Sequence, residues 1–304
     1  MKIVFAGSPE YSLPTLRSLC ACGEVVGVLT QPDKPVGRKK ILTPTPVKQY
    51  AAEHGIPVLD LPKIRDHVEK VRALGGEVMF TCAYGQILSK DILALFPNGV
   101  WNLHASLLPK FRGASPIQAA ILAGERYTGV TVMRTEEALD SGDMLLVKRC
   151  EVGQKTCGEL SEELSRLSAE AAEEALGYIA AGHPQVLMQD EAAATYCKKI
   201  SKADARLNFA DADPAVRLIN AMSPSPLAYC MIGGVQLNIH KAELVDSPCG
   251  GEPGEVVRAD RGGIVVSCGS GAFKIISAQF AGGKKLSACD LVNGRKIKAG
   301  DRLE

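Results

Sequence analysis

The chain has 304 residues, of which 46% are hydrophobic and 23% charged, and its formal net charge is +1. This composition is typical of a globular protein with one large domain and a smaller one. We expect no membrane attachment, because no apolar run approaches the roughly 20 residues that cross a bilayer and the first residues lack the apolar region of a signal peptide. Ten cysteines at irregular spacings, with no C-x-x-C pair, predict reduced thiols in the cytoplasm and neither a disulfide framework nor a metal site.

Strand and helix patterns alternate from the start of the chain. Lys2 to Ala6 is a short apolar strand, Gly7-Ser8-Pro9 turns into a leucine-rich helix, and Val25 to Thr30 is a second strand. This order predicts an α/β fold with a doubly wound, mostly parallel sheet. The turn lacks the G-x-G-x-x-G spacing that brings a backbone against a pyrophosphate, so no dinucleotide cofactor is predicted.

Residues 31–46 form a loop rich in proline, glycine and lysine directly after the second strand. Ligands of open α/β sheets bind at that end of the strands, so the loop is either a substrate-binding arm or an ordinary exposed loop. The net charge gives no support for nucleic-acid binding, but local clusters of Lys and Arg can contact phosphates. For each cluster the alternative is a solvated basic face. The two clusters are Lys34, Arg38, Lys39 and Lys40, and Lys284, Lys285, Arg295, Lys296, Lys298 and Arg302.

The alternation continues through residues 47–54 as a helix, 56–59 as a strand and 64–74 as a helix. Glu77 to Cys82 predicts a further buried strand, which breaks at Ala83-Tyr84-Gly85. We therefore expect this strand to lie in the same sheet as the first two.

Asn102 and His104 lie two residues apart in a segment that predicts a strand. Side chains at positions i and i+2 of a strand share a face, so the amide and the imidazole should point the same way. Pro109 cannot continue a central strand, and the chain is expected to leave the sheet there.

The segment that follows predicts a helix, a strand and an acidic turn. Ser115-Pro116 is a helix-start signal, residues 117–122 fill the helix, and Gly129 to Met133 alternates as a strand. The turn Asp140-Ser141-Gly142-Asp143 comes next. This order can return Asp140 to the side of the sheet where Asn102 and His104 end.

An amide, an imidazole and a carboxylate in one place suggest acyl transfer without a covalent nucleophile. An imidazole can move a proton near neutral pH, an amide can donate to a developing oxyanion, and a carboxylate can orient the imidazole or relay a proton through water. The alternative is that His104 is an ordinary structural residue, since a motif match is only a hypothesis.

The C-terminal part of the chain has a different pattern. Residues 157–180 predict a long amphipathic helix, and residues 184–202 read as a linker with little periodicity. Several short β-rich runs separated by glycines follow, with a short helix at 288–292, and together they indicate a small barrel. We predict a catalytic domain at 1–183, the linker at 184–202 and a β-barrel domain at 203–304.

Six segments together resemble the formyltransferases that use 10-formyltetrahydrofolate. They are F-A-G-S-P-E, Q-P-D-K-P-V-G-R, N-L-H-A-S-L-L-P, R-G-A-S-P-I-Q, T-G-V-T-V-M and L-D-S-G-D-M. Within the family, the resemblance implies transfer of the formyl group to the α-amine of methionine on initiator methionyl-tRNA. It implies an OB-like C-terminal barrel that holds tRNA and 10-formyltetrahydrofolate as co-substrate. We also expect no metal and a cytoplasmic protein that is a monomer.

The resemblance also assigns residues. Asn102 and protonated His104 would stabilise the oxyanion, and Asp140 rather than Asp143 would hold the imidazole, with Thr131 as a supporting hydroxyl. One wall of the folate pocket would be Ala83, Tyr84, Gly85, Gln86, Ile87 and Leu88, a second Ser106, Leu107, Leu108 and Pro109, and a third Val132 to Asp140. The tRNA contacts would be Lys34, Arg38, Lys39, Lys40, Lys284 and Lys285.

Two alternatives remain open. One is a formyltransferase with the same donor that acts on an amino sugar or on glycinamide ribonucleotide. A small acceptor would need neither the basic loop nor the β-rich C-terminal part. The other is an RNA-binding module with an inert enzyme-like half, which the presence of all three site residues disfavours.

Overall fold

The structure is a computed structural model that describes residues 1–37, 39–182, 184–245 and 250–304. Arg38, one of the predicted tRNA-binding residues, lies outside the described residues. The chain forms two compact units that interleave in sequence. Unit 1 comprises Met1–Pro116, Thr128–Cys150 and Ser161–Cys197, and unit 2 comprises Ile117–Tyr127, Glu151–Leu160 and Lys198–Glu304.

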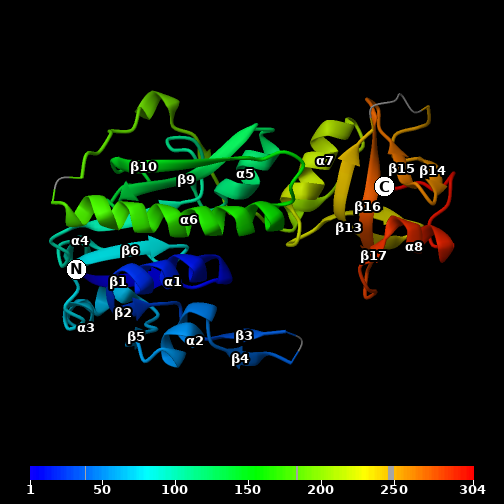
Figure 1. The fold of residues 1–304 in the computed structure, drawn as a ribbon. Helices are drawn as coiled ribbons and strands as arrows, with labels where there is room; N and C mark the ends of the chain where they lie inside the picture. The colour runs from blue at the N-terminus through cyan, green and yellow to red at the C-terminus, as the bar shows by residue number, and fades with distance from the viewer. Residues whose placement is uncertain (38, 183, 246–249) are drawn as a thin grey trace. The chain divides into compact units, whose positions relative to one another are not determined.

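A seven-stranded sheet forms the centre of unit 1, with the strand order β10-β9-β7-β6-β1-β2-β5 (Figure 1). The pairs β1–β2, β1–β6, β2–β5 and β6–β7 are parallel, and β7–β9 is antiparallel. The predicted doubly wound, mostly parallel sheet is therefore confirmed. The strands are β1 (Lys2–Gly7), β2 (Glu24–Leu29), β5 (Val58–Leu59), β6 (Val78–Cys82), β7 (Val100–His104), β9 (Tyr127–Arg134) and β10 (Met144–Glu151).

The central strands are almost entirely apolar and buried, as strands covered on both faces must be. All five residues of β6 are buried, and Phe5 and Phe80 are completely inaccessible. The helices of unit 1 are α1 (Leu13–Cys22), α2 (Pro46–Glu53), α3 (Val68–Arg72), α4 (Lys90–Leu93) and most of α6 (Cys157–Ala180). Helix α5 (Pro116–Leu122) and the first turn of α6 belong to unit 2, apart from Pro116.

Local signals account for several helix boundaries. Thr45 caps α2 by accepting a hydrogen bond from the Lys48 backbone N–H, and a proline occupies the first turn. Gly124 follows α5 with φ +68°, the left-handed conformation that glycine adopts without a Cβ penalty. The long helix α6 is bonded to the 3-10 helix before α1 (Glu10–Ser12), where the Ser165 hydroxyl donates to the Tyr11 carbonyl at 2.6 Å.

Three expectations about local structure were wrong, and one strand was missed. The predicted loop at 31–46 contains a short antiparallel hairpin, β3 (Lys34–Val36) with β4 (Ile41–Thr43). The helix expected at 64–74 is split, because His67 leaves helical geometry with φ −132° between a 3-10 turn and α3. Strand β7 ends at His104, well before Pro109. Strand β10 at the sheet edge was not predicted at all.

Unit 2 is built on an antiparallel sheet with the order β12-β13-β16-β15-β14, and β17 pairs with β16. The C-terminal residues join its two edge strands: Met231 and Glu304 exchange backbone hydrogen bonds of 2.7 and 2.8 Å, and Val256 N–H donates to the Asp301 carbonyl at 2.8 Å. The sheet is thereby closed into the small barrel that the sequence predicted. Its elements are β12 (Ala228–Ile232), β13 (Val235–Leu244), β14 (Val256–Asp260), β15 (Gly263–Ser267), β16 (Ala272–Phe280), β17 (Leu286–Ser287) and α8 (Ala288–Asn293).

One helix in unit 2 was missed. Helix α7 (Ala212–Ala221) packs its apolar face on the barrel core and is capped by the Asp211 side chain, which accepts from the Asp213 N–H. The cap and the apolar spacing of Val216 and Ile219 were both present in the sequence, but the surrounding β-rich pattern hid them.

Candidate functional site

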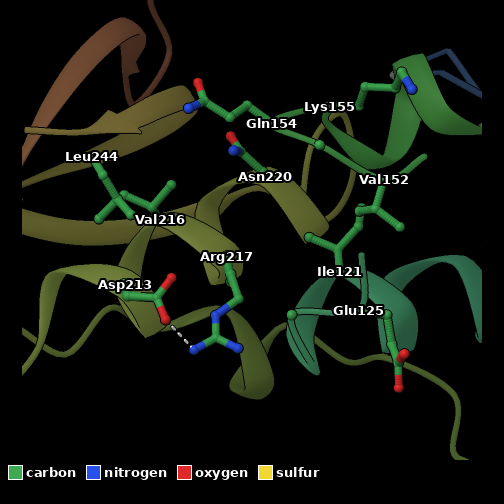
Figure 2. Close-up of a pocket in the computed structure, with 12 residues that line it drawn as sticks. Ile121, Glu125, Val152, Gln154, Lys155, Asp213, Val216, Arg217, Asn220 and Leu244 are labelled. Carbon is green, nitrogen blue, oxygen red and sulfur yellow. Dashed lines mark hydrogen bonds and ion pairs between the residues drawn. The ribbon is translucent and has the colours of Figure 1, made fainter. Parts of the chain in front are cut away.

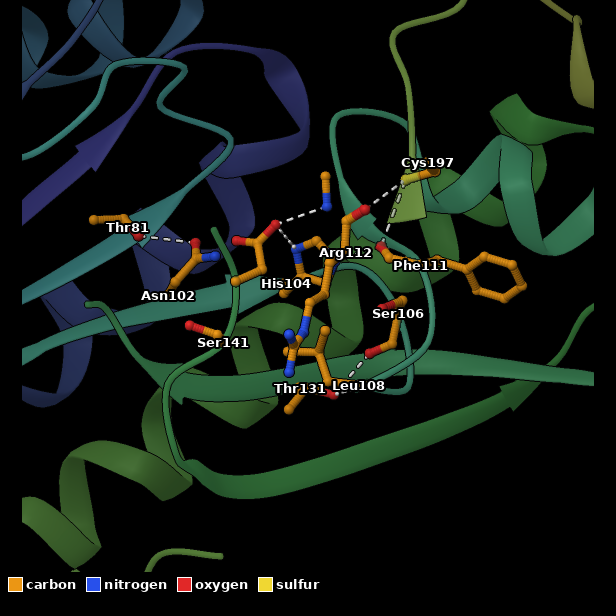
Figure 3. Close-up of polar contacts among 12 residues, drawn as sticks. Thr81, Asn102, His104, Ser106, Leu108, Phe111, Arg112, Thr131, Ser141 and Cys197 are labelled. Carbon is orange, nitrogen blue, oxygen red and sulfur yellow. Dashed lines mark hydrogen bonds and ion pairs between the residues drawn. The ribbon is translucent and has the colours of Figure 1, made fainter. Parts of the chain in front are cut away.

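Strand β7 places the two predicted polar side chains on one face of the sheet near its end. His104 is buried and Asn102 is half-buried. The neighbouring strand β6 presents Thr81 opposite Asn102, and the Thr81 hydroxyl donates to Asn102 Oδ1 at 2.8 Å (Figure 3). Because this contact engages the oxygen of the amide, the Asn102 NH₂ group is directed away from Thr81. Within the described chain no acceptor is bonded to that NH₂ group.

Both ring nitrogens of His104 face hydrogen-bond acceptors. Nε2 lies 2.9 Å from the Phe111 carbonyl oxygen, and Nδ1 lies 3.6 Å from Asp140 Oδ2. A carbonyl and a carboxylate can only accept, so the doubly protonated ring is the form that donates toward both. The His104 side chain is 6% exposed and that of Asp140 15%, and the limited access of water strengthens the attraction between them.

Asp140 reaches this position through an unusual backbone conformation. Its φ is +48°, in the left-handed region that non-glycine residues adopt at a cost. Its Oδ2 atom accepts a hydrogen bond of 2.8 Å from the Gly113 N–H as well as facing His104. Asp143, the competing carboxylate, uses its backbone carbonyl to accept from the Arg134 N–H, and its side chain makes no described contact with His104.

The loop after β7 is fixed by hydroxyl groups. The Thr131 hydroxyl donates to the Ser106 carbonyl at 2.7 Å and accepts from the Leu108 N–H at 3.1 Å, while the Ser106 hydroxyl donates to the Lys110 carbonyl at 2.6 Å. Thr131 thus supports the loop rather than the imidazole. In the predicted second wall, Ser106 and Leu108 are buried, and Leu107 and Pro109 are half-buried.

Part of the predicted linker, residues 195–197, is bonded to the chain at Phe111–Gly113. Residues 196–197 form β11, which pairs in parallel with β8 (Arg112–Gly113). Thr195 Oγ1 accepts from the Phe111 N–H at 2.8 Å, and the Cys197 thiol contacts the carbonyl oxygens of Phe111 and Arg112 (Figure 3). Burial raises the pKa of the Cys197 thiol, and the nearby Asp140 carboxylate raises it further. The sulfur is therefore kept as a thiol, which is a weak nucleophile.

Arg112 anchors this segment from inside the protein. Its side chain is 1% exposed, and it donates to Gln189 Oε1, to both oxygens of Glu191 and to the Tyr196 hydroxyl at 2.7 to 3.2 Å. The hydrogen bonds to Glu191 raise the pKa of Arg112 above its already high ordinary value, so the guanidinium stays charged. Sequence reasoning missed Arg112, Gln189 and Glu191, because their contacts span more than 70 residues along the chain.

The predicted first folate wall alternates between buried and exposed residues. Tyr84 and Leu88 are buried in the core, whereas Ala83, Gly85 and Ile87 are exposed. The Gln86 side chain is engaged by the backbone of the neighbouring segment. It accepts from the Ile64 N–H and donates to the Leu61 carbonyl, both at 2.8 Å. Three residues of this wall are thus accessible to a ligand, and Gln86 acts as a fixing contact for the turn.

The predicted tRNA-binding lysines are exposed. Lys34, Lys39 and Lys40 lie on the β3–β4 hairpin, and Lys284 and Lys285 lie on the turn between β16 and β17. Within the described residues none of the five forms an ion pair. Their charges are available to a phosphate.

A hollow of about 200 Å³ lies within unit 2, apart from these groups, between α7 and the segment that precedes α6 (Figure 2). Its charged lining includes Arg217, paired with Asp213, and Lys155, whose Nζ donates to the Glu151 carbonyl.

In the described part of the chain no three His, Cys, Asp or Glu side chains are grouped as metal ligands. No helix there has the length and apolar character of a membrane span.

Comparison with known proteins places the chain in a family. Residues 2–176 match the family described as formyl transferase, and residues 199–296 match the formyl transferase C-terminal domain. The first match covers more than half of the chain, and the chain therefore belongs to the formyltransferase family.

Its curated relatives have a more specific name. A methionyl-tRNA formyltransferase of Stenotrophomonas maltophilia is 42% identical over 301 residues, which cover 97% of this chain and 98% of the relative. One of Chromobacterium violaceum is 42% identical over 309 residues, covering 100% and 99%.

A solved structure shares the fold. HypX from Aquifex aeolicus, in complex with tetrahydrofolic acid, aligns with a TM-score of 0.66 at 18% identity. The alignment covers 97% of this chain and 47% of HypX, so the chain spans about half the length of that protein.

Proposed function

We propose that this protein transfers the formyl group of 10-formyltetrahydrofolate to the α-amine of methionine on initiator methionyl-tRNA, for translation initiation. Full-length similarity to methionyl-tRNA formyltransferases supports this acceptor. The observation that carries the chemistry is the contact of 3.6 Å between the His104 imidazole and the Asp140 carboxylate, with an uncommitted Asn102 NH₂ group on the same strand.

The reaction forms one C–N bond and breaks another. The neutral amine attacks the formyl carbon, and the carbonyl oxygen becomes an oxyanion, toward which Asn102 donates. Asp140, through a water molecule, takes one proton from the attacking amine. Collapse of the tetrahedral intermediate breaks the bond to N10 of the folate, which receives a proton, so the overall reaction moves one amine proton to the leaving nitrogen.

His104 serves this reaction as the protonated partner of Asp140. Its Nε2–H faces the Phe111 carbonyl oxygen. An oxyanion would either share this N–H donor with the carbonyl or replace the carbonyl as its acceptor. Because an oxyanion is a stronger acceptor than a neutral carbonyl, the exchange favours the transition state over the ground state.

The folate donor would lie between the exposed residues of the 83–88 turn, the 106–109 loop and the segment from Val132 to Asp140. We assign tRNA contacts to the exposed lysines of the β3–β4 hairpin and to Lys284 and Lys285. Residues 1–183 would supply catalysis and residues 203–304 the tRNA-binding barrel, joined by residues 184–202. The protein would act as a monomer in the cytoplasm, where its cysteines stay reduced.

Formylation of charged initiator tRNA by the purified protein tests the proposal. The expected result is formylmethionyl-tRNA formed in proportion to 10-formyltetrahydrofolate consumed. Formylation of an amino sugar or of glycinamide ribonucleotide, without reaction on tRNA, would contradict the proposed acceptor and identify a small molecule in its place. If the protein binds tRNA but transfers no formyl group to tRNA, to an amino sugar or to glycinamide ribonucleotide, it is an RNA-binding protein and not an enzyme.

A further inference from the structure

The buried carboxamide of Gln189 joins two parts of the candidate site. Gln189 is 6% exposed, and its Nε2 donates to the carbonyl oxygens of Asp140 and Gly142 at 2.9 and 2.7 Å. Its Oε1 accepts from Arg112 Nε and Nη2 at 3.1 and 2.8 Å. The orientation of the amide is fixed, because the reversed group would set N–H against N–H and carbonyl against carbonyl.

The turn that Gln189 holds has little freedom of its own. Asp140 is in the left-handed backbone region, a conformation that persists only where its surroundings enforce it. Two residues further on, the backbone at Gly142 packs so closely that an added Cβ would lie 2.0 Å from the Arg134 carbonyl oxygen. Gln189 donates hydrogen bonds to the carbonyls of both residues and so fixes the position of the turn relative to His104.

Arg112 connects the same carboxamide to the imidazole. The carbonyl of the preceding residue, Phe111, accepts from His104 Nε2, and the Arg112 N–H donates to the Thr195 carbonyl at 2.8 Å. The backbone at 111–112 therefore holds one side of the imidazole. The Arg112 side chain, through Gln189, holds the carboxylate-bearing turn on the other.

We propose that Gln189 is a positioning residue that sets the placement of the Asp140 carboxylate against His104. The inference rests on the proposed function, in which Asp140 takes part in proton transfer. Gln189 acts through Asp140 and not on the substrate. A displacement of about 1 Å at a reacting group can lower the rate about 100-fold, so removal of the two hydrogen bonds from Gln189 Nε2 should lower turnover and leave substrate binding intact.

Gln189→Glu in the full-length protein tests this role. The substitution keeps the shape and the acceptor for Arg112 but replaces the NH₂ donor with an oxygen that faces two carbonyls. We expect kcat for formyl transfer to fall about 10- to 100-fold, with KM for donor and tRNA changed by less than about twofold. Turnover is expressed per site that binds a folate analogue, so unfolded protein is not counted. Gln189→Met, which removes the donor and also the acceptor for Arg112 without adding charge, should give the same separation of kcat from KM.

Gln236→Glu is the matched control. Gln236 Nε2 donates to Asn238 Oδ1 at 2.7 Å on β13 in unit 2, so the same chemical change should leave kcat unaltered.

A double-mutant comparison separates positioning from general structural support. In the Asp140→Asn background, Gln189→Glu should lower kcat by less than about a further twofold, because the carboxylate it positions is gone. A full additional loss in that background, or wild-type kcat in both Gln189 variants, overturns the positioning role. If Asp140→Asn itself has wild-type turnover, the proposed function of Asp140 fails first, so the two failures are distinguishable.

Discussion

The His104–Asp140 site and the exposed lysines of this protein are organised in opposite ways. Around His104 and Asp140 the backbone holds both side chains: His104 Nε2 faces the Phe111 carbonyl, and Asp140 Oδ2 accepts from the Gly113 N–H. Arg112, one of the supporting residues, is a buried cation. The lysines at 34, 39, 40, 284 and 285 are exposed and unpaired within the described residues. Chemistry at a reacting bond requires groups fixed in advance. Attraction of a polyanion requires only that charges reach its phosphates.

The largest test of this contrast is removal of the proposed catalytic pair. His104→Ala or Asp140→Asn should lower kcat by about 100-fold or more, because general acid–base help is lost. The affinity for a folate analogue, measured by calorimetry, should stay the same. Near-wild-type turnover in either variant would contradict the assigned mechanism.

The lysine clusters should behave differently, with an effect on tRNA binding and not on turnover. Replacing Lys39 and Lys40, or Lys284 and Lys285, with glutamine should raise KM for tRNA roughly tenfold near physiological salt. The slope of log KM against log salt should fall by roughly 0.9 for each duplex phosphate that the variant no longer neutralises. Rates over a salt series measure KM and its salt dependence. An unchanged slope in both double variants would show that these lysines do not contact tRNA phosphates and only form a solvated basic surface.

A smaller effect is expected from the residue that orients the Asn102 amide. Thr81→Val removes the hydrogen bond to Oδ1 at almost constant volume, and one such bond contributes about 1 kcal/mol. We expect kcat to fall about fivefold, with donor KM unchanged, and Thr81→Ser to retain most of the activity. Equal activity in the valine and serine variants would show that Thr81 does not orient the amide.

The smallest predicted effect concerns the ion pair between Arg112 and Glu191. The hydrogen bonds from Arg112 hold the pKa of Glu191 below its ordinary value of 4.5. The ionised carboxylate therefore stabilises the folded protein above about pH 4.5, and this contribution is lost as the pH falls through the lowered pKa. The difference in unfolding midpoint between wild type and Glu191→Gln should be present at pH 7 and should decrease as the pH is lowered below 4.5. A difference independent of pH would mean that the charge of Glu191 has no part in the stabilisation.

The sequence by itself determined the parts of this protein that depend on local pattern. The alternation of apolar strands and helices predicted the parallel sheet, and α6 was predicted with the bounds it has, Cys157–Ala180. The spacing of two between Asn102 and His104 correctly placed both on one face, because side chains alternate along a strand. The motifs also selected Asp140 over Asp143, and the structure brings Asp140 to His104.

Only the tertiary structure decided which distant residues support that pair. Thr81 lies beside Asn102 because β6 and β7 are paired in register. Gln189 and Glu191 meet Arg112 although 77 and 79 residues separate them. The segment that carries them has no periodicity, since its order comes from hydrogen bonds to other parts of the chain and not from a buried face of its own. Such contacts leave no repeating signal in a single sequence, because any loop of this composition could make them or not, depending on how the sheet is assembled.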